Sequence, residues 1–308
     1  MNNKNQPLKI WLGLITLYLV WGSTYLCIRF VVESVPPFMA SGCRNFFAGL
    51  LLLIFSIISK KYQKTSRKLL ITTTLSGFFM LTLGNGFFTI AAQWIPSSYS
   101  ALFSASGPVM LIALLWLMNN EKPKQKVIIG AVLGVVGVGI LMSLKSLALK
   151  GTEQYYLLGI LLLFLAVLGW NIGVVLVKKA NVNNYNATQI SGMQMLIGGA
   201  LSLIISGLYG EFNNFHFENI PSKALWSFAY LLTFGSIIAF LVFGWLSKVA
   251  PPTLVATYTY VNPLVAMILG ATFANERLHP MMILAGGIII TAVILITSAN
   301  RKQISQQN

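Results

Sequence analysis

Apolar stretches of about twenty residues recur along the whole chain, separated by short polar or proline-containing breaks. A helix that crosses a hydrocarbon core of roughly 30 Å needs about 20 consecutive apolar residues. The pattern therefore predicts ten transmembrane helices. The longest break, 211–222, is predicted to be a plain solvated loop. The predicted spans are 10–32, 38–59, 69–92, 97–118, 125–144, 156–177, 187–210, 223–246, 253–275 and 279–298.

The composition excludes a soluble globule. Hydrophobic residues make up 56% of the 308 residues and charged residues only 9%, whereas soluble domains carry roughly 25% charged residues. The first apolar run is longer than a signal-peptide core and no small-residue cleavage site follows it, so we interpret it as a retained membrane helix. The chain is predicted to be an all-α, multi-pass protein of the inner (plasma) membrane, with the lipid bilayer as its surroundings.

Basic residues are unevenly distributed between the two sides of the predicted membrane. With the N-terminus in the cytoplasm, fifteen of the 21 Lys and Arg lie on the cytoplasmic side. The opposite side holds five: Arg29, Lys145, Lys150, Lys223 and Arg277. This asymmetry obeys the positive-inside rule and predicts that both termini are cytoplasmic. The net charge of +15 is thereby attributed to membrane insertion, and no nucleic-acid partner is predicted.

The sequence repeats itself in two halves. At an offset of 155, AlaLeuPheSerAlaSerGlyProValMet (101–110) aligns with 256–265. Five predicted spans fall in each half, 10–144 and 156–298, and five is an odd number. The two halves must therefore enter the membrane in opposite directions, an architecture typical of secondary transporters with a midplane site. Further matches, at offsets of 149 to 155, are Trp21 with Trp170, Arg29 with Lys178, Ser41-Gly42 with Ser191-Gly192, Pro96 with Pro251, Pro108 with Pro263, and Glu121 with Glu276.

Three motifs resemble those of a known superfamily. They are TrpGlySer at 21–23, a proline-centred fourth helix that ends at AsnGlu (120–121), and TyrValAsnPro (260–263) running on to AsnGluArgLeu (275–278). Together they resemble the drug/metabolite transporter superfamily, in particular its ten-helix EamA type with two EamA domains. The resemblance implies a transporter, usually an exporter of amino acids or other small metabolites. AsnGlu stands here where the family more often has GlyGlu.

Polar and aromatic residues in mid-span are the candidates for a substrate cavity. Most tryptophans lie near span ends, where the membrane interface favours them, but Trp21 and Trp170 lie deep inside their helices. A buried indole N–H needs a partner or a wet cavity, so each is either a packing residue or part of a cavity wall. Polar groups at this depth face a partner helix or a cavity. The other candidates of this kind are Asn85, Asn171, Tyr258 and Asn262.

Two mid-span prolines, Pro108 and Pro263, are repeat mates. A proline removes one helical hydrogen bond and clashes with the carbonyl four residues earlier. The carbonyls of Ser104 and Thr259 are thus expected to lack their helical partners. Each proline marks either a fixed kink or a hinge beside the cavity.

Arg44 is the only charge predicted to lie clearly inside a span. It is expected either to extend to the membrane surface or pair with Glu33, or to line the cavity and attract a carboxylate. All six Glu lie in loops or at span ends, and Glu121 and Glu276 are expected to cap the helices that follow them. Arginine stays protonated in proteins, so no embedded group is available as a proton carrier. Facilitated diffusion or substrate exchange is the resulting hypothesis.

Other function classes find little support in the residues. Two His and no Asp leave few candidates for acid–base or metal chemistry, and no phosphate-binding loop for ATP is present. No catalytic residue, metal or cofactor is predicted. Cys27 and Cys43 lie in apolar spans, so no disulfide is predicted. The alternatives left open are an exporter of a lipophilic cationic drug or nucleotide sugar, and a channel-like protein, as monomer or homodimer. The glycines of the fifth and tenth spans are expected to pack these two helices together.

Overall fold

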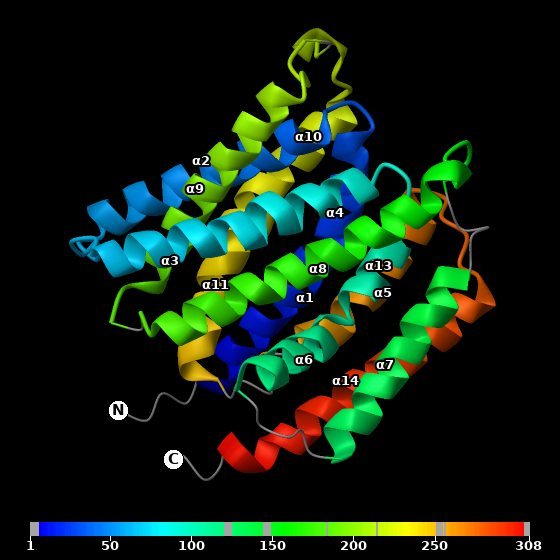
Figure 1. Cartoon of the computed structure of the whole chain (residues 1–308). Helices are drawn as coiled ribbons and strands as arrows, with labels where there is room; N and C mark the ends of the chain where they lie inside the picture. Colours follow the sequence, from blue (N-terminus) through cyan, green and yellow to red (C-terminus); the bar gives the residue numbers. More distant parts are fainter. Residues whose placement is uncertain are drawn as a thin grey trace.

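The computed structural model describes residues 6–119, 125–143, 149–182, 184–213, 215–250, 255 and 257–304. Every regular element in these ranges is a helix (Figure 1). The helices of the first half are α1 (Gln6–Val32), α2 (Pro37–Ile58), α3 (Arg67–Gly77), the π-helix η1 (Phe78–Asn85), α4 (Gly86–Ala91), α5 (Ser97–Ser104), α6 (Gly107–Asn119) and α7 (Gln125–Ser143). Those of the second half are the short 3-10 helix η3 (Glu153–Tyr155), α8 (Tyr156–Ala180), α9 (Ala187–Leu208), the 3-10 helix η4 (Phe217–Asn219), α10 (Ser222–Tyr230), the π-helix η5 (Leu231–Ile238), α11 (Ala239–Val249), α13 (Tyr258–Phe273) and α14 (Pro280–Ile304).

Seven helical segments are long and apolar enough to cross a bilayer. They are Gln6–Val32, Pro37–Ile58, Arg67–Ala91, Ser97–Leu117, Glu153–Ala180, Ala187–Leu208 and Ser222–Leu246. Three shorter apolar helices, Gln125–Ile140, Val261–Phe273 and Pro280–Ala292, coincide with the remaining predicted spans. Large apolar side chains such as Leu12, Ile54 and Ile283 are exposed on the outside of the bundle, where lipid tails would cover them. The prediction of an all-α, multi-pass membrane protein is confirmed.

The helices form one bundle whose two ends are easily told apart (Figure 1). The start of α1 and the end of α14 lie at one end, which we call the termini end. The connections α1–α2, α4–α5, α9–α10 and α13–α14 lie at the opposite end, which we call the far end. Local sequence sets these helix boundaries: Pro37 begins α2, the Ser66 hydroxyl accepts from the Leu69 N–H at the start of α3, and Asn181 ends α8 in a left-handed conformation.

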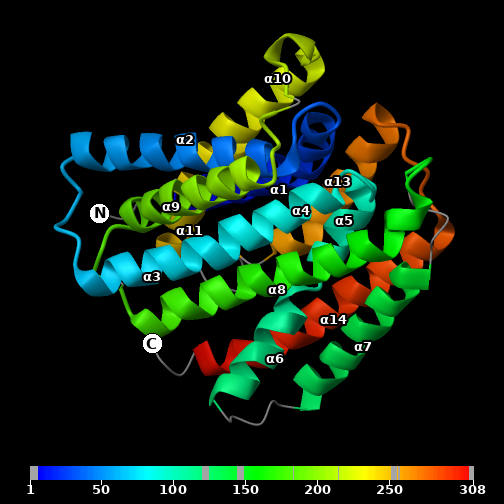
Figure 2. The same cartoon turned by 45° about the horizontal axis from the view of Figure 1, so that its top comes forward.

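The equivalent helices α2 and α9 pack against each other in opposite directions (Figure 2). A Cβ placed on Gly49 would lie 2.2 Å from the Leu196 nitrogen, and one on Gly199 would lie 2.3 Å from the Phe46 nitrogen. These contacts are reciprocal, because an offset of 150 converts Gly49 to Gly199 and Phe46 to Leu196. As the residue numbers increase along α2, the numbers of the residues that they contact on α9 decrease, so the two helices are antiparallel. Close backbone approach of this kind requires glycine.

A second pair of equivalent helices, α7 and α14, lies side by side at the edge of the bundle (Figures 1 and 2). A Cβ on Gly137 would lie 2.6 Å from the Ile289 side chain and 3.2 Å from the Ala285 carbonyl. This confirms the predicted packing of the fifth and tenth spans. Glu121, whose capping was predicted, lies outside the described residues.

Two membrane segments contain π-helical stretches in equivalent positions. The stretches are η1 (Phe78–Asn85) and η5 (Leu231–Ile238), each eight residues long, and they are related by an offset of 153. Stretches of π-helix inside α-helices frequently mark functional sites. Nothing in the hydrophobic pattern predicted them, since a π-turn leaves the span equally apolar.

Candidate functional site

Trp21 lies in an aromatic cluster formed by α1, α11 and α13. Its ring centroid is 4.8 Å from that of Tyr258, 5.4 Å from Phe243 and 5.8 Å from Phe240. Its Nε1 donates to the Gly235 carbonyl of η5 at 3.2 Å, which supplies the partner that a buried indole needs. Two of the predicted cavity residues, Trp21 and Tyr258, are thus in direct contact across the two halves of the chain.

Asn262 extends this cluster by one helical turn of α13. Its side chain is buried, and with its amide nitrogen turned inward it donates to the carbonyls of Tyr258 at 3.1 Å and Tyr18 at 3.3 Å. The Tyr18 and Thr257 hydroxyls hydrogen-bond to each other across the same seam. The α1–α13 contact is therefore polar at membrane depth, and Trp21, Tyr258 and Asn262 form one group.

The other predicted cavity residues lie in different surroundings. Trp170 packs against the cluster of Ala48, Leu52, Leu81 and Met195. Phe240 packs against that same cluster and also touches Trp21 edge-on, so it stands between the neighbourhoods of the two repeat-mate tryptophans.

Asn85 and Asn171 both donate hydrogen bonds to nearby groups. Asn85 donates to Asn45 Oδ1 at 3.5 Å, and Asn45 in turn donates to the Ser41 hydroxyl at 3.3 Å. Asn171 donates to the Val167 carbonyl of its own helix at 2.8 Å. The buried amide Asn45, one turn after Ser41 in an apolar helix, was missed from sequence, although its depth in a span was a usable signal.

The two predicted proline sites differ. The fourth membrane segment is interrupted at Ala105 and Ser106, between α5 and α6, and Pro108 is the second residue of α6. A proline is tolerated in the first turn of a helix because the N–H it lacks would have no helical partner there. Pro263 instead lies inside α13, five residues after its start.

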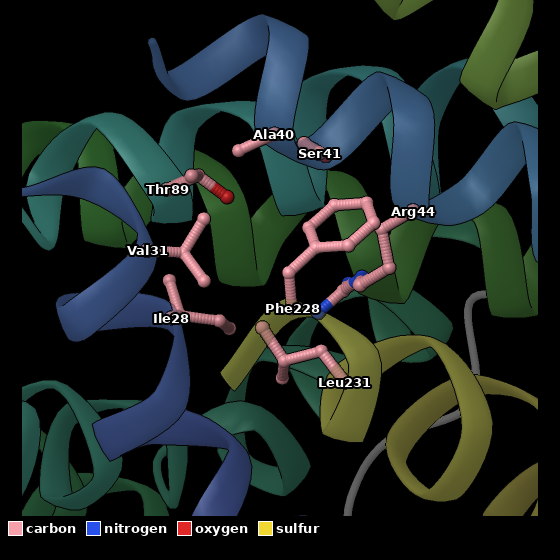
Figure 3. Close-up of a pocket in the computed structure, with 8 residues that line it drawn as sticks. All are labelled: Ile28, Val31, Ala40, Ser41, Arg44, Thr89, Phe228 and Leu231. Carbon is pink, nitrogen blue, oxygen red and sulfur yellow. The ribbon is translucent and has the colours of Figure 1, made fainter. Parts of the chain in front are cut away.

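Arg44 projects from α2 into a small cavity near the far end (Figure 3). The wall is formed mainly by apolar side chains, among them Val31 of α1, Phe228 of α10 and Leu231 of η5. The volume is about 10 Å³, roughly the space that one water requires. Among the described residues Arg44 has no ion pair, and its Nε is shielded from solvent without a hydrogen-bond partner.

The predicted pairing of Arg44 with Glu33 is wrong. The Glu33 carboxylate accepts instead from Lys223 Nζ at 2.9 Å, in an exposed pair at the start of α10. Lys223 is the nearer partner because the α9–α10 connection brings it over the end of α1, whereas Arg44 lies two turns inside the bundle.

A second cavity of about 190 Å³ lies toward the termini end. It is bounded by the end of α2, the start of α9 and the middle of α11, with Lys61, Asn186 and Trp245 among its lining residues. The Asn186 side chain accepts from the Thr188 N–H at 2.8 Å and so caps α9. Apart from Arg44 at the far-end cavity, no predicted site residue lines either of these two cavities.

Glu276, in the α13–α14 connection, is the most heavily bonded carboxylate in the described part of the chain. It accepts from the backbone N–H and hydroxyl of Ser97, both at 2.8 Å, and from those of Ser98 at 3.0 and 2.6 Å. Arg29, in the last turn of α1, forms an ion pair with it. Burial raises the pKa of this carboxyl, but the hydrogen bonds from Ser98 and Ser97 outweigh that and leave it below its ordinary value. We call Arg29, Ser97, Ser98 and Glu276 the far-end lock.

The expected capping role of Glu276 needs correction. It caps the start of α5, in the other half of the chain, and not α14, which follows it. The turn of the chain explains this choice: Asn275 has a φ of 51°, which directs the Glu276 side chain back into the bundle. Glycine and asparagine both adopt such a conformation readily, so Asn at this position, where the family more often has Gly, fits the same turn.

The connection at 211–222 is also more than a solvated loop. Glu211 accepts from the Phe38 and Met39 N–H groups at 3.2 and 2.8 Å, and from the Ser206 hydroxyl at 2.7 Å. A carboxylate is favourable at a helix N-terminus because free N–H groups and the helix dipole point toward it. Glu211 therefore ties α9 to the start of α2, a contact 172 residues apart in the chain that no local pattern reveals.

A family model of the EamA-like transporter family matches residues 8–143 and again residues 157–298. The chain belongs to this family. The inner membrane transporter YedA of Escherichia coli K12 is 32% identical to this chain over 294 residues, which cover 95% of this chain and 92% of YedA. The transporter YvbV of Bacillus subtilis is 25% identical and covers 93% of this chain. These similarities confirm the predicted family and place the EamA protein among membrane transporters, not enzymes.

Further comparisons agree on the fold and the surroundings. Protein PecM of Dickeya dadantii is 25% identical over 284 residues. A solved crystal structure that is 17% identical superposes with a TM-score of 0.64 over 95% of this chain and 97% of the other; at that identity the likeness shows the fold alone. The predicted location in the inner membrane agrees with that of YedA and with the several apolar helices.

Proposed function

We propose that this EamA protein is a secondary transporter that exports amino acids or related small metabolites by alternating access. Its moving units are the inverted halves 10–144 and 156–298, with ten membrane helices in all. The observation that carries the proposal is the antiparallel packing of α2 against α9 through reciprocal glycine contacts. Two halves related in this way can exchange conformations and so expose a shared site to either side in turn.

The far-end lock supports the proposal that the protein is closed at its far end in this conformation. Glu276 belongs to the second half, whereas Arg29, Ser97 and Ser98 belong to the first, so the lock joins the halves at the far end. The repeat relates Glu276 to Glu121, Arg29 to Lys178, and Ser97-Ser98 to Pro252-Thr253. Proline has neither an N–H nor a hydroxyl to donate, so the sequence does not repeat the serine donors of the far-end lock in the other half. Glu121 and 252–253 lie outside the described residues.

We further propose that Trp21, Asn85, Trp170, Asn171, Tyr258, Asn262 and Arg44 face a common substrate path when the far-end lock opens. The contacts of Phe240 with Trp21 and with the cluster that holds Trp170 support this, because a side chain that separates the two regions can move as the halves rock. Pro108, after the break in the fourth segment, and Pro263 in α13 are proposed as the bending points.

The transport proposal predicts exchange that needs no proton gradient. Among the described residues every Glu lies in a connection, in the short surface helices η3 and η4, or at the very end of a membrane helix, so no embedded carboxylate is available as a proton carrier. Purified protein is placed in phosphatidylcholine vesicles loaded with an unlabelled amino acid. These vesicles should take up the same amino acid, added outside in labelled form, by counterflow at equal pH on both sides. Trp21→Ala and Trp170→Ala should each lower the rate about tenfold, which corresponds to a loss of about 1.4 kcal/mol of binding free energy. Uptake without trans-stimulation would indicate a channel, and a strict requirement for a pH gradient would contradict the coupling proposal.

The orientation is tested separately. We expect a reporter fused after residue 64 and one fused after the last residue to show cytoplasmic activity, because the basic residues are concentrated on that side. A fusion in the connection at 211–222 is the matched control and should report the opposite side. Periplasmic-type activity at residue 64 or at the C-terminus would overturn the assignment of the termini end to the cytoplasm.

A further inference from the structure

The described residues around the cavity leave the charge and the N–H donors of Arg44 without partners. A guanidinium carries five N–H donors in a planar fork. Arg44 has no hydrogen-bond acceptor among the described residues, and its Nε is shielded from solvent. The two acids at the start of α2 have other partners: Glu33 pairs with Lys223, and Glu211 caps α2. An uncompensated charge at membrane depth is costly and is usually retained for function.

The internal repeat supplies a comparison within the same molecule. The offset of 150 that relates α2 to α9 places Gln194 at the position equivalent to Arg44. Gln194 is buried and donates to the Ser76 hydroxyl at 2.8 Å. A neutral amide with a partner is therefore sufficient for packing at this position. The charge of Arg44 is a property of one half only, and packing does not account for it.

We infer that Arg44 is the binding site for the carboxylate of the transported compound, an inference that rests on the proposed transport function. The arginine fork matches a carboxylate with two parallel N–H···O bonds. A single cation in a mainly apolar wall suits a compound with one carboxylate group beside an apolar body, and Val31, Phe228 and Leu231 line the cavity next to Arg44 (Figure 3). A doubly charged phosphate would require further cations that this wall does not contain.

The site and the far-end lock are mechanically linked through α1. Ile28 of α1 lines the cavity and the next residue, Arg29, belongs to the lock. In the locked conformation the cavity holds only about 10 Å³, too little for a carboxylate. Release of Arg29 from Glu276 frees this end of α1 to move away from α2 and widen the cavity. The carboxylate thus binds the conformation in which the far end is open and favours it over the locked one.

The test compares acids with their amides. Thermal unfolding of the purified protein is measured with each L-amino acid and with the primary amide of each one that stabilises it. At least one acid should stabilise the wild type and its amide should not. Arg44→Gln, which copies Gln194, should weaken that response by about 10- to 100-fold, the range expected on loss of a charge-assisted hydrogen bond. Arg67→Gln removes the same charge at an exposed position of α3 and should respond as the wild type does.

Each other result contradicts the inference: no acid stabilises the wild type, acid and amide act equally, or Arg44→Gln keeps the wild-type affinity. Arg44→Lys, which keeps the charge without the fork, should retain part of the response and provides a second variant if Arg44→Gln does not fold. Counterflow in phosphatidylcholine vesicles, which contain no carboxylate, separates the two proposals. Equal exchange by wild type and Arg44→Gln would leave transport standing and remove the carboxylate site, whereas no exchange by the wild type would refute transport itself.

Discussion

Replacing Glu276 with alanine is expected to lower the free energy of unfolding by about 3 kcal/mol, because breaking a buried ion pair leaves its partners uncompensated. Arg29 would lose its counter-charge, and the Ser97 and Ser98 N–H groups would lose their acceptor at the start of α5. The far end would no longer be held closed, so counterflow should also fall. Thermal or denaturant unfolding in detergent and the vesicle assay measure the two effects.

The matched control is Glu33→Ala. Glu33 also forms an ion pair, with Lys223, but the two side chains are 46% and 52% exposed, and exposed pairs contribute only about 0–1 kcal/mol. Loss of the Glu33 pair should therefore leave stability and transport near wild type. If the two alanine variants behave alike, the far-end lock does not hold the halves together.

The lock also predicts how stability depends on pH. Since the folded-state pKa of Glu276 lies below its ordinary value of 4.5, its contribution is fully present above that value and is lost as the pH falls through the lower folded-state pKa. Glu276→Gln cannot titrate, so the variant should lose stability less steeply than the wild type on acidification below about pH 4.5.

Replacing Gly49 with alanine is expected to destabilise the protein by about 3 kcal/mol, the upper range for overpacking. The added Cβ would lie 2.2 Å from the Leu196 nitrogen and 2.7 Å from the Gly192 carbonyl oxygen, so the backbones of α2 and α9 would have to separate. Because this seam joins the two halves, counterflow should fall as well. Thermal unfolding and the vesicle assay again provide the readouts.

Gly139→Ala is the control for the helix itself. Apart from its own helical turn, nothing in the described structure lies within 4 Å of a Cβ at Gly139, and alanine is favoured over glycine in a helix by about 1 kcal/mol. That variant should be as stable as the wild type or slightly more so. An equally stable Gly49→Ala would mean that the α2–α9 seam is looser than the reciprocal contacts indicate.

Much of the architecture follows from the sequence alone. Apolar length and the 149–155 residue offsets predicted a helical membrane protein with two repeats, because burial in lipid requires long apolar runs and a duplicated fold keeps its landmarks. The deep position of Arg44 and its exceptional charge were visible for the same reason. Trp21, Tyr258 and Asn262 stood out as polar or aromatic groups in mid-span, and the structure brings these three together.

Only the tertiary structure showed which side chains pair with one another across the bundle. From the sequence, Glu33 was a predicted ion-pair partner of Arg44, and Glu276 was predicted to cap α14. A local pattern can only compare residues near each other in the chain. In the structure Glu33 pairs with Lys223 and Glu276 caps α5, 178 residues away. The π-helical turns η1 and η5 were equally hidden. Hydrophobicity determines which segments enter the membrane. Which side chains meet there depends on how the two halves pack, and that geometry brings together groups that no local pattern relates.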